Sequence, residues 1–241
     1  MEVRSFVDAR DLARSAAKLI LDHCEETLAT RPGCYSLGVS GGRTPQVMFR
    51  ELAALPMPWS RVHIFQVDER VAPAGDGDRN LTQLTDCLLE RVPIPSENVH
   101  PMPVESEDLV AACRRYEDEL LRVTDGAALD ILQLGLGDDG HTASLAPGDP
   151  ILEIADRGIW CVDAFNGLAR MSMTYPFINR AERLLWLAVG PSKAEMCRRL
   201  AASDPTIPAG RVEPKNAILL VDREAGQLLS PPAPQEPLTP V

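Results

Sequence analysis

Short apolar segments alternate with amphipathic stretches along this chain, and that alternation constrains the fold more than any other feature of the sequence. Seven apolar runs have the length and composition of strands: 34–39, 62–67, 129–134, 159–163, 170–175, 184–190 and 216–221. Five stretches have the apolar periodicity of helices: 8–30, 44–54, 80–91, 106–123 and 192–202. Strands that alternate with helices favour a parallel sheet covered on both faces. We therefore expect an α/β fold, Rossmann-like and mostly parallel, with helices on both faces.

The ends of several segments carry local signals. Asp8 is expected to cap the first helix, and Thr44 followed by Pro45 is typical of an N-cap and first helical position. Because no linker or internal repeat divides the chain, we expect a single domain over 1–230. The last segment, 231–241, is rich in proline and is expected to be a disordered tail.

Charge and cysteine content restrict the class of protein. A net charge of −11 argues against a nucleic-acid partner, which would require a basic face. No apolar stretch approaches the roughly 18 residues of a membrane span, and the charged N-terminus is unlike a secretory signal. The six cysteines show no paired spacing, which favours reduced thiols and a cytoplasmic location. The oligomeric state is left open.

Polar clusters follow three of the expected strands, at the ends where open α/β sheets bind ligands. The first cluster is Ser40–Thr44, with the sequence SGGRT. Gly41 and Gly42 would let an anion approach the backbone at the start of a helix, and the side chains of Ser40, Arg43 and Thr44 can donate. This cluster predicts a phosphate site. The alternative is a tight glycine turn with a solvated arginine.

The second cluster is Gly135–Ser144, and its first six residues, GLGDDG, match a dinucleotide-binding pattern. Two features oppose that interpretation: Asp138 and Asp139 would repel a pyrophosphate, and Pro147 would break the following helix. The glycines instead expose His141, and Asp139 could fix its tautomer and raise its basicity. A lone histidine is often structural, but this position makes His141 a candidate general base.

The third cluster is Asp68–Glu69–Arg70. It is either a surface ion pair or a site where Arg70 stabilises an oxyanion or binds phosphate. Lys193, at the start of a later helix, is a candidate second cation for the phosphate. No cluster has the spacing of metal ligands, so no metal is expected.

Five segments together resemble the 6-phosphogluconolactonase family, within the glucosamine/galactosamine-6-phosphate isomerase superfamily. They are SGGRTP (40–45), VDERVAP (67–73) with Asn80 downstream, LGLGDDGHTASLAPG (134–148), RMSMTYPFIN (170–179) and GPSKAEM (190–196). DGHTAS is the most specific of them. Ala146 departs from the family, which usually has an aromatic residue there, but the change removes no reacting group.

The resemblance implies hydrolysis of 6-phospho-D-glucono-1,5-lactone in the oxidative pentose phosphate pathway, without a cofactor. It implies that His141 is the base, helped by Asp139, and that Asp68 and Arg70 line the site. It also implies that the Ser40–Thr44 loop, Lys193 and Arg170 hold the phosphate.

The same motifs occur partly in two other kinds of protein. Glucosamine-6-phosphate deaminases look similar, but after the catalytic histidine they carry Ile-Ala-Phe-Asn-Glu-Pro, whereas this chain has Thr142–Pro147, TASLAP, without that glutamate. A non-catalytic sugar-phosphate sensor would need the phosphate loop but no base, so the intact DGH argues against it.

Overall fold

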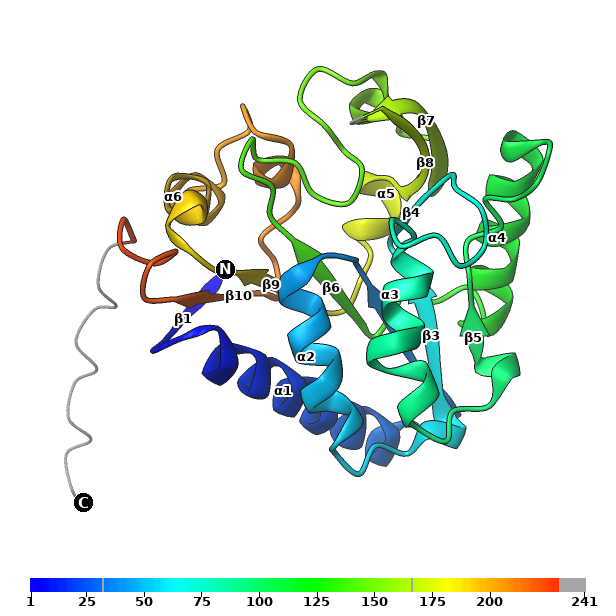
Figure 1. Cartoon of the computed structure of the whole chain (residues 1–241), viewed down its shortest axis with the longest axis horizontal. Helices are drawn as coiled ribbons and strands as arrows, with labels where there is room; N and C mark the ends of the chain where they lie inside the picture. Colours follow the sequence, from blue (N-terminus) through cyan, green and yellow to red (C-terminus); the bar gives the residue numbers. More distant parts are fainter. Residues whose placement is uncertain (32, 166, 230–241) are drawn as a thin grey trace.

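Seven strands form a central sheet in which every pair is parallel, in the order β1-β10-β9-β6-β2-β3-β5 (Figure 1). Their bounds are β1 (Glu2–Phe6), β2 (Tyr35–Val39), β3 (Val62–Gln66), β5 (Val99–His100), β6 (Ile131–Gly135), β9 (Leu184–Ala188) and β10 (Ala217–Asp222). The predicted mostly parallel α/β fold is confirmed.

The fold is seen in a computed structural model that describes residues 1–31, 33–165 and 167–229. The tail predicted for 231–241, and the domain boundary at 230, lie outside the described residues. Both stay predictions.

Helices cover the two faces of the sheet (Figure 1). Their bounds are α1 (Ala9–Thr30), α2 (Arg43–Ala53), α3 (Asn80–Cys87), α4 (Leu109–Val123), α5 (Tyr175–Ile178) and α6 (Ala194–Ala201). Short 3₁₀ turns lie at η1 (Trp59–Arg61), η2 (Leu89–Arg91), η3 (Ser96–Asn98), η4 (Pro150–Glu153), η5 (Pro191–Lys193) and η6 (Pro208–Arg211).

The strands are apolar on both sides because each face packs against its own core. Leu185 and Leu187 of β9 belong to the core beneath α1, α2 and α3, whereas Leu184 and Trp186 belong to the core beneath α4 and α6. A strand that is buried on both faces has a continuous apolar sequence. These strands could therefore be predicted from their apolar runs.

A second, antiparallel sheet lies apart from the first, in the order β4-β8-β7 (Figure 1). It consists of β4 (Asp68–Arg70), β8 (Leu168–Met173) and β7 (Ile159–Phe165). The runs at 159–163 and 170–175 were expected in the parallel sheet, and that placement is wrong. They are joined by a short connection that includes Gly167 at φ 82°, and such a connection allows only antiparallel pairing.

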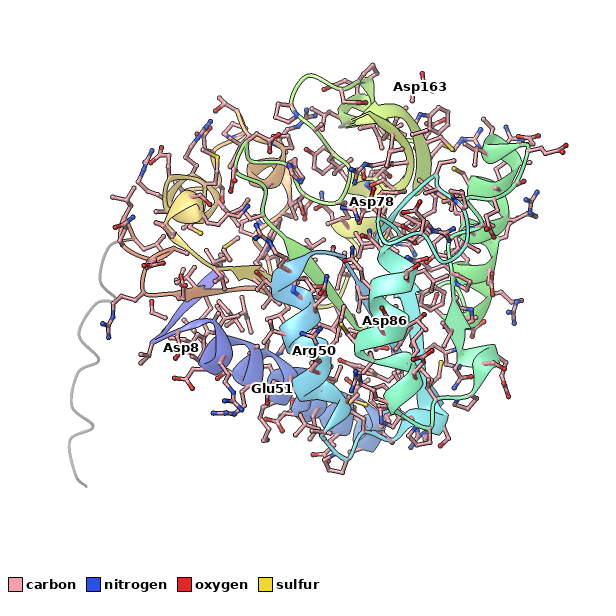
Figure 2. All side chains as sticks on the ribbon, in the orientation of Figure 1. Asp8, Arg50, Glu51, Asp78, Asp86 and Asp163 are labelled. Atoms are coloured by element: carbon pink, nitrogen blue, oxygen red, sulfur yellow. The ribbon has the colours of Figure 1, made fainter. Side chains whose placement is uncertain are left out.

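Two predictions about helix starts have opposite outcomes. Asp8 caps α1 by accepting hydrogen bonds from the backbone N–H groups of Arg10 and Asp11, both at 2.9 Å, so this prediction is confirmed (Figure 2). The Thr44 cap is wrong. Helix α2 begins at Arg43, and its N-cap is Gly42 with φ 114°, a conformation that a threonine would adopt only with strain.

Strands β1 and β5 were not predicted. Both lie at the edges of the sheet, and β5 has only two residues. Strand β1 is polar and partly exposed, so it lacks the apolar run that marks a buried strand.

The charged side chains of Arg50 and Asp86 are exposed on α2 and α3, whereas Glu51 of α2 lies near Arg10 and Arg14 of α1 (Figure 2). Within the part of the chain that the structure describes, no helix has both the length and the apolar character required to cross a bilayer.

Candidate active site

A cleft of about 830 Å³ lies at the carboxyl ends of β2, β6 and β9 and against the small sheet. All eleven site residues proposed from the sequence line it: Ser40, Gly41, Gly42, Arg43, Thr44, Asp68, Arg70, Asp139, His141, Arg170 and Lys193. Residues spread over more than 150 positions of the chain therefore meet in one cleft, because parallel strands bring their carboxyl ends to the same edge.

The loop between β2 and α2 is held closely against α3. A Cβ atom on Gly41 would lie 1.9 Å from Oδ1 of Asn80, so only glycine fits there. The backbone N–H of Ser40 donates to Oε1 of Gln133 at 3.0 Å, and its hydroxyl donates to the Gln133 carbonyl at 3.1 Å. The Ser40 side chain thus fastens the loop to β6 instead of donating into the cleft.

The start of α2 can receive an anion. Among the described residues no side chain caps this helix, and Arg43 and Thr44 contribute its first backbone N–H groups. Arg43 is exposed and also lines the cleft. Unsatisfied N–H groups and the helix dipole favour a phosphate at this position.

His141 lies at the tip of a tight loop that begins at Gly137. The Gly137 N–H donates to the His141 carbonyl at 2.8 Å, and a Cβ atom on Gly137 would lie 2.0 Å from the His141 Nδ1. The His141 side chain is 29% exposed, so it is accessible to a small molecule. The glycine therefore allows the histidine ring to fold back over its own loop.

Asp139 fixes the orientation of the His141 ring. Its Oδ1 lies 2.6 Å from the His141 Nδ1 and accepts the His141 backbone N–H at 3.0 Å. Burial alone would raise the pKa of Asp139, but the hydrogen bonds from His141 hold it below its ordinary value. An ionised Asp139 keeps the proton on Nδ1, and in the neutral ring this places the lone pair on Nε2.

One face of the small sheet turns charged side chains to the cleft. Asp68 and Arg70 of β4 pair with Ser172 and Arg170 of β8, so the two arginines are cross-strand neighbours. Arg170 lies 3.8 Å from Asp68, whose other contacts include the Ser144 hydroxyl at 2.8 Å. Burial raises the pKa of Asp68, against the opposing effects of Ser144 and Arg170.

Glu69 points away from this face and has a structural role. Its side chain is fully buried and accepts backbone N–H groups at 2.7–2.8 Å from Arg70, Asn80 and Leu81. Arg79, also buried, lies 3.2 Å from the same carboxylate. Glu69 thus ties β4 to the start of α3, whereas Asp68 is the carboxylate of the pair that reaches the cleft.

Lys193 forms an ion pair with Asp138 at the edge of the cleft. Its Nζ lies 2.6 Å from Oδ1 of Asp138, which also accepts from the Ser192 hydroxyl at 3.1 Å. The hydrogen bond from Lys193 is the main reason that the pKa of Asp138 is lowered. Any anion that binds Lys193 must therefore compete with Asp138.

Three residues that contact the site residues were not assigned a role in the sequence analysis: Asn80, Ser144 and Gln133. Asn80 donates to the Asp68 carbonyl at 2.9 Å and accepts from Arg70 at 3.1 Å. The Ser144 hydroxyl donates to Asp68, and the Gln133 side chain accepts from the Ser40 backbone N–H. Asn80 and Ser144 fall in the family motifs, but no local pattern marks Gln133, because its partner, Ser40, follows the neighbouring strand β2.

Within the described ranges, no three His, Cys, Asp or Glu side chains gather closely enough to hold a metal ion.

The fold and the cleft define an α/β enzyme in which an uncapped helix start and a carboxylate–histidine pair line one cleft. The family model described as glucosamine-6-phosphate isomerases/6-phosphogluconolactonase matches residues 7–221, and the chain belongs to this family.

Curated relatives are similar over nearly their whole length. The 6-phosphogluconolactonase of Synechocystis sp. is 35% identical, covering 95% of this chain and 99% of that protein. The 6-phosphogluconolactonase of Mycobacterium tuberculosis is 34% identical, covering 94% of this chain and 98% of that protein. These relatives support the expectation of a lactone-hydrolysing enzyme.

Solved structures agree on the fold. The 6-phosphogluconolactonase of Thermotoga maritima matches with a TM-score of 0.82 and 27% identity, over 92% of this chain and 98% of that chain. A monomeric glucosamine-6-phosphate deaminase matches with a TM-score of 0.80 and 23% identity, over 95% of this chain and 100% of that chain. The fold alone thus does not separate the two activities.

The role of Glu69 predicts a loss of stability on substitution. Glu69→Gln keeps the shape but replaces one acceptor oxygen by an amide that cannot accept the buried N–H groups. We expect the free energy of unfolding to fall by about 2–4 kcal/mol. Urea denaturation followed by circular dichroism measures this change.

Glu51→Gln is the matched control, because Glu51 is a partly exposed residue whose ion pairs with Arg10 and Arg14 are 3.7 and 3.9 Å long. Its stability should change by less than about 0.5 kcal/mol. If the two variants were equally stable, the structural role given to Glu69 would be wrong.

Proposed function

We propose that this chain hydrolyses 6-phospho-D-glucono-1,5-lactone to 6-phospho-D-gluconate, a step of the oxidative pentose phosphate pathway. The observation that carries the proposal is the Asp139–His141 pair, at 2.6 Å, in the same cleft as the anion-binding start of α2. We place the reaction in the cytoplasm, where the six free thiols of the chain would be kept reduced.

The phosphate of the substrate binds at the start of α2. The backbone N–H groups after Gly41 and Gly42 and the side chains of Arg43 and Thr44 surround it. Ser40 holds this loop through Gln133. Lys193 turns from Asp138 toward the phosphate, and Arg170 adds a further positive charge to the cleft.

His141 acts as the general base. The Nε2 atom of the neutral ring takes a proton from a water molecule as that water attacks the lactone carbonyl. Asp139 stabilises the resulting imidazolium and keeps the ring in place.

The tetrahedral intermediate carries a negative charge on the former carbonyl oxygen. Arg70, held by Asn80, stabilises this charge, and Asp68 keeps Arg170 in position beside it. The carbon–oxygen bond of the ring then breaks, and the ring oxygen leaves as an alcohol after it receives the proton from His141. Because a lactone is an activated ester, the mechanism uses no cofactor or metal.

The segment after His141 favours hydrolysis over the deaminase reaction. Thr142 and Ser144 are fully buried there, and Ser144 holds Asp68. The chain has no glutamate between 142 and 147 that could work on the histidine.

Replacing the base tests the proposal directly. His141→Asn should fold normally, because the side chain is partly exposed, but kcat should fall by roughly 100- to 10,000-fold. Turnover is measured on freshly made 6-phosphogluconolactone, with spontaneous hydrolysis subtracted. His63→Asn is the control and should keep its turnover. His63 lies near the N-terminal end of β3 and is not among the residues that line the cleft. Near-normal turnover in the His141 variant would refute this base.

The phosphate contacts predict substrate discrimination. Glucono-1,5-lactone without the phosphate should be a poor substrate, because binding at the phosphate orients the distant carbonyl. Lys193→Gln and Arg43→Gln should each lower kcat/KM for the phosphorylated lactone by roughly 10- to 100-fold and leave the other lactone unaffected.

Lys215→Gln is the matched control, because Lys215 is exposed and is not among the residues that line the cleft. Equal kcat/KM for the two lactones in the unchanged enzyme would show that the phosphate does not anchor the substrate.

A further inference from the structure

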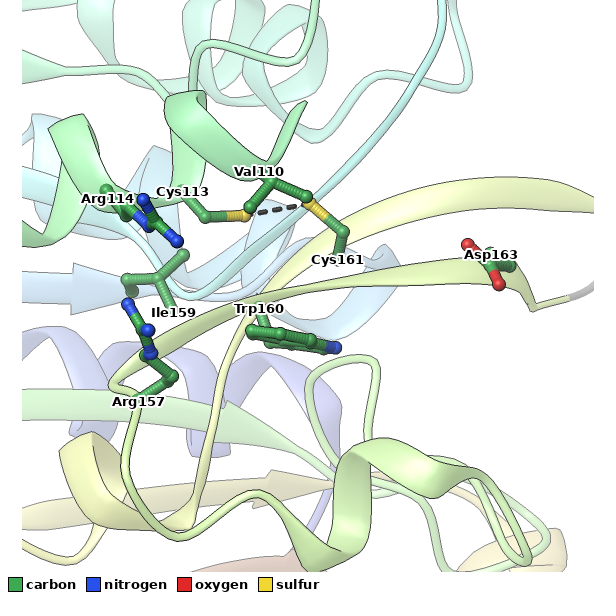
Figure 3. Close-up of a pocket in the computed structure, with 8 residues that line it drawn as sticks. All are labelled: Val110, Cys113, Arg114, Arg157, Ile159, Trp160, Cys161 and Asp163. Atoms are coloured by element: carbon green, nitrogen blue, oxygen red, sulfur yellow. Dashed lines mark hydrogen bonds between the residues drawn. The ribbon is translucent and has the colours of Figure 1, made fainter. Parts of the chain in front are cut away.

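Two cysteines face each other outside the active cleft. Cys113 on α4 and Cys161 on β7 have their sulfur atoms 2.8 Å apart, although they are 48 residues apart in sequence (Figure 3). Both are free thiols. Formation of a disulfide would need the sulfurs to approach by less than about 1 Å, which small side-chain rotations can supply.

The pair borders a cavity of about 200 Å³ that a small oxidant can enter. Figure 3 shows Arg114 and Arg157 on one side of it and Trp160 below the sulfur atoms. Cys161 is partly exposed, whereas Cys113 is only 3% exposed. A reagent in the cavity therefore reaches Cys161 first.

The two thiols differ in acidity. The hydrogen bond from Cys113 is the main cause of a lowered pKa at Cys161, against the opposing effect of burial. The same hydrogen bond, together with burial, raises the pKa of Cys113. A partly exposed thiol of lowered pKa beside a second thiol is the arrangement of a reactive cysteine and its resolving partner.

We propose that Cys113 and Cys161 form a reversible intrachain disulfide when the folded protein meets hydrogen peroxide. The Cys161 thiolate attacks one peroxide oxygen, the O–O bond breaks, and the product is a sulfenic acid and a hydroxide that takes up a proton. The Cys113 sulfur then attacks the Cys161 sulfur, loses its proton and expels water. Overall, two thiols are oxidised to a disulfide and one peroxide is reduced to two waters.

The bond would join α4 to the small sheet. Cys161 pairs with Met171 in the register of β7 and β8, and the next pair is Val162 with Arg170. The crosslinked strand, β7, is therefore adjacent to β8, which carries the cleft residue Arg170. Because it closes a 48-residue loop in the unfolded chain, it should stabilise the folded protein.

Peptide mapping tests the proposal on the unchanged protein. The reduced protein is treated with hydrogen peroxide, its remaining thiols are alkylated, and it is digested with trypsin without reductant. The expected product joins peptides 92–114 and 158–170, each of which contains a single cysteine. Dithiothreitol should separate them. Recovery of both peptides alkylated or singly oxidised, with no linked product, would overturn the proposal.

Variants separate this pair from general thiol oxidation. Cys34→Ser removes another partly exposed thiol and should leave the linked peptides unchanged. Cys113→Ser should abolish the link and leave Cys161 trapped as a sulfenic or sulfinic acid. A link between Cys161 and a different cysteine in the unchanged protein would contradict the assignment.

The melting temperature gives a second readout. Peroxide should raise it by roughly 5–15 °C in the unchanged protein and in Cys34→Ser, but not in Cys113→Ser. A crosslinked protein that melts at a lower temperature would show that the bond strains the folded structure, and it would overturn the claim that the folded structure accommodates the disulfide.

Discussion

Parallel pairing of all seven strands in the central sheet is the constraint on which the cleft depends. Each connection must return across a face of the sheet, so the chain leaves every strand at the same edge. The loops after β2, β6 and β9 therefore converge, although they carry residues as distant in sequence as Gly41, His141 and Lys193. The small sheet closes this edge with Asp68, Arg70 and Arg170. A fixed arrangement of donors thus results from backbone pairing before any substrate is bound.

The parallel sheet and the residues that line the cleft could be predicted from the sequence because both depend on local patterns. Strands buried on two faces read as apolar runs, and glycines mark the loops that follow them. Asp139 and His141 are two residues apart, so their hydrogen bond could be proposed from spacing alone. The roles of Glu69 and Asp68 could not be separated in the same way. Only the pleat of β4, which turns Asp68 and Arg70 to one face and Glu69 to the other, distinguishes them.

Contacts between segments that are distant in sequence could not be predicted from local patterns. The bond from Ser40 to Gln133 spans 93 residues, and the ion pair of Lys193 with Asp138 joins two separate loops. The antiparallel sheet was also missed, although Arg170 and Ser172 alternate with Met171 and Met173 as a strand with one polar face would. The N-cap of α2 was misplaced by two residues, at Thr44 instead of Gly42, because Gly42 adopts φ 114°, which Thr44–Pro45 does not reveal.

The pairing of β1 has a consequence for how the protein is made. This edge strand pairs with β10, and Glu2 lies opposite Ile218, so its partner is synthesised more than 200 residues later. At ribosomal rates, β1 waits roughly 10–40 s before β10 leaves the ribosome. Strands β2, β3 and β6 can meet much earlier, because their separations are shorter. The N-terminal edge of the sheet therefore cannot be completed until nearly the whole chain has been made.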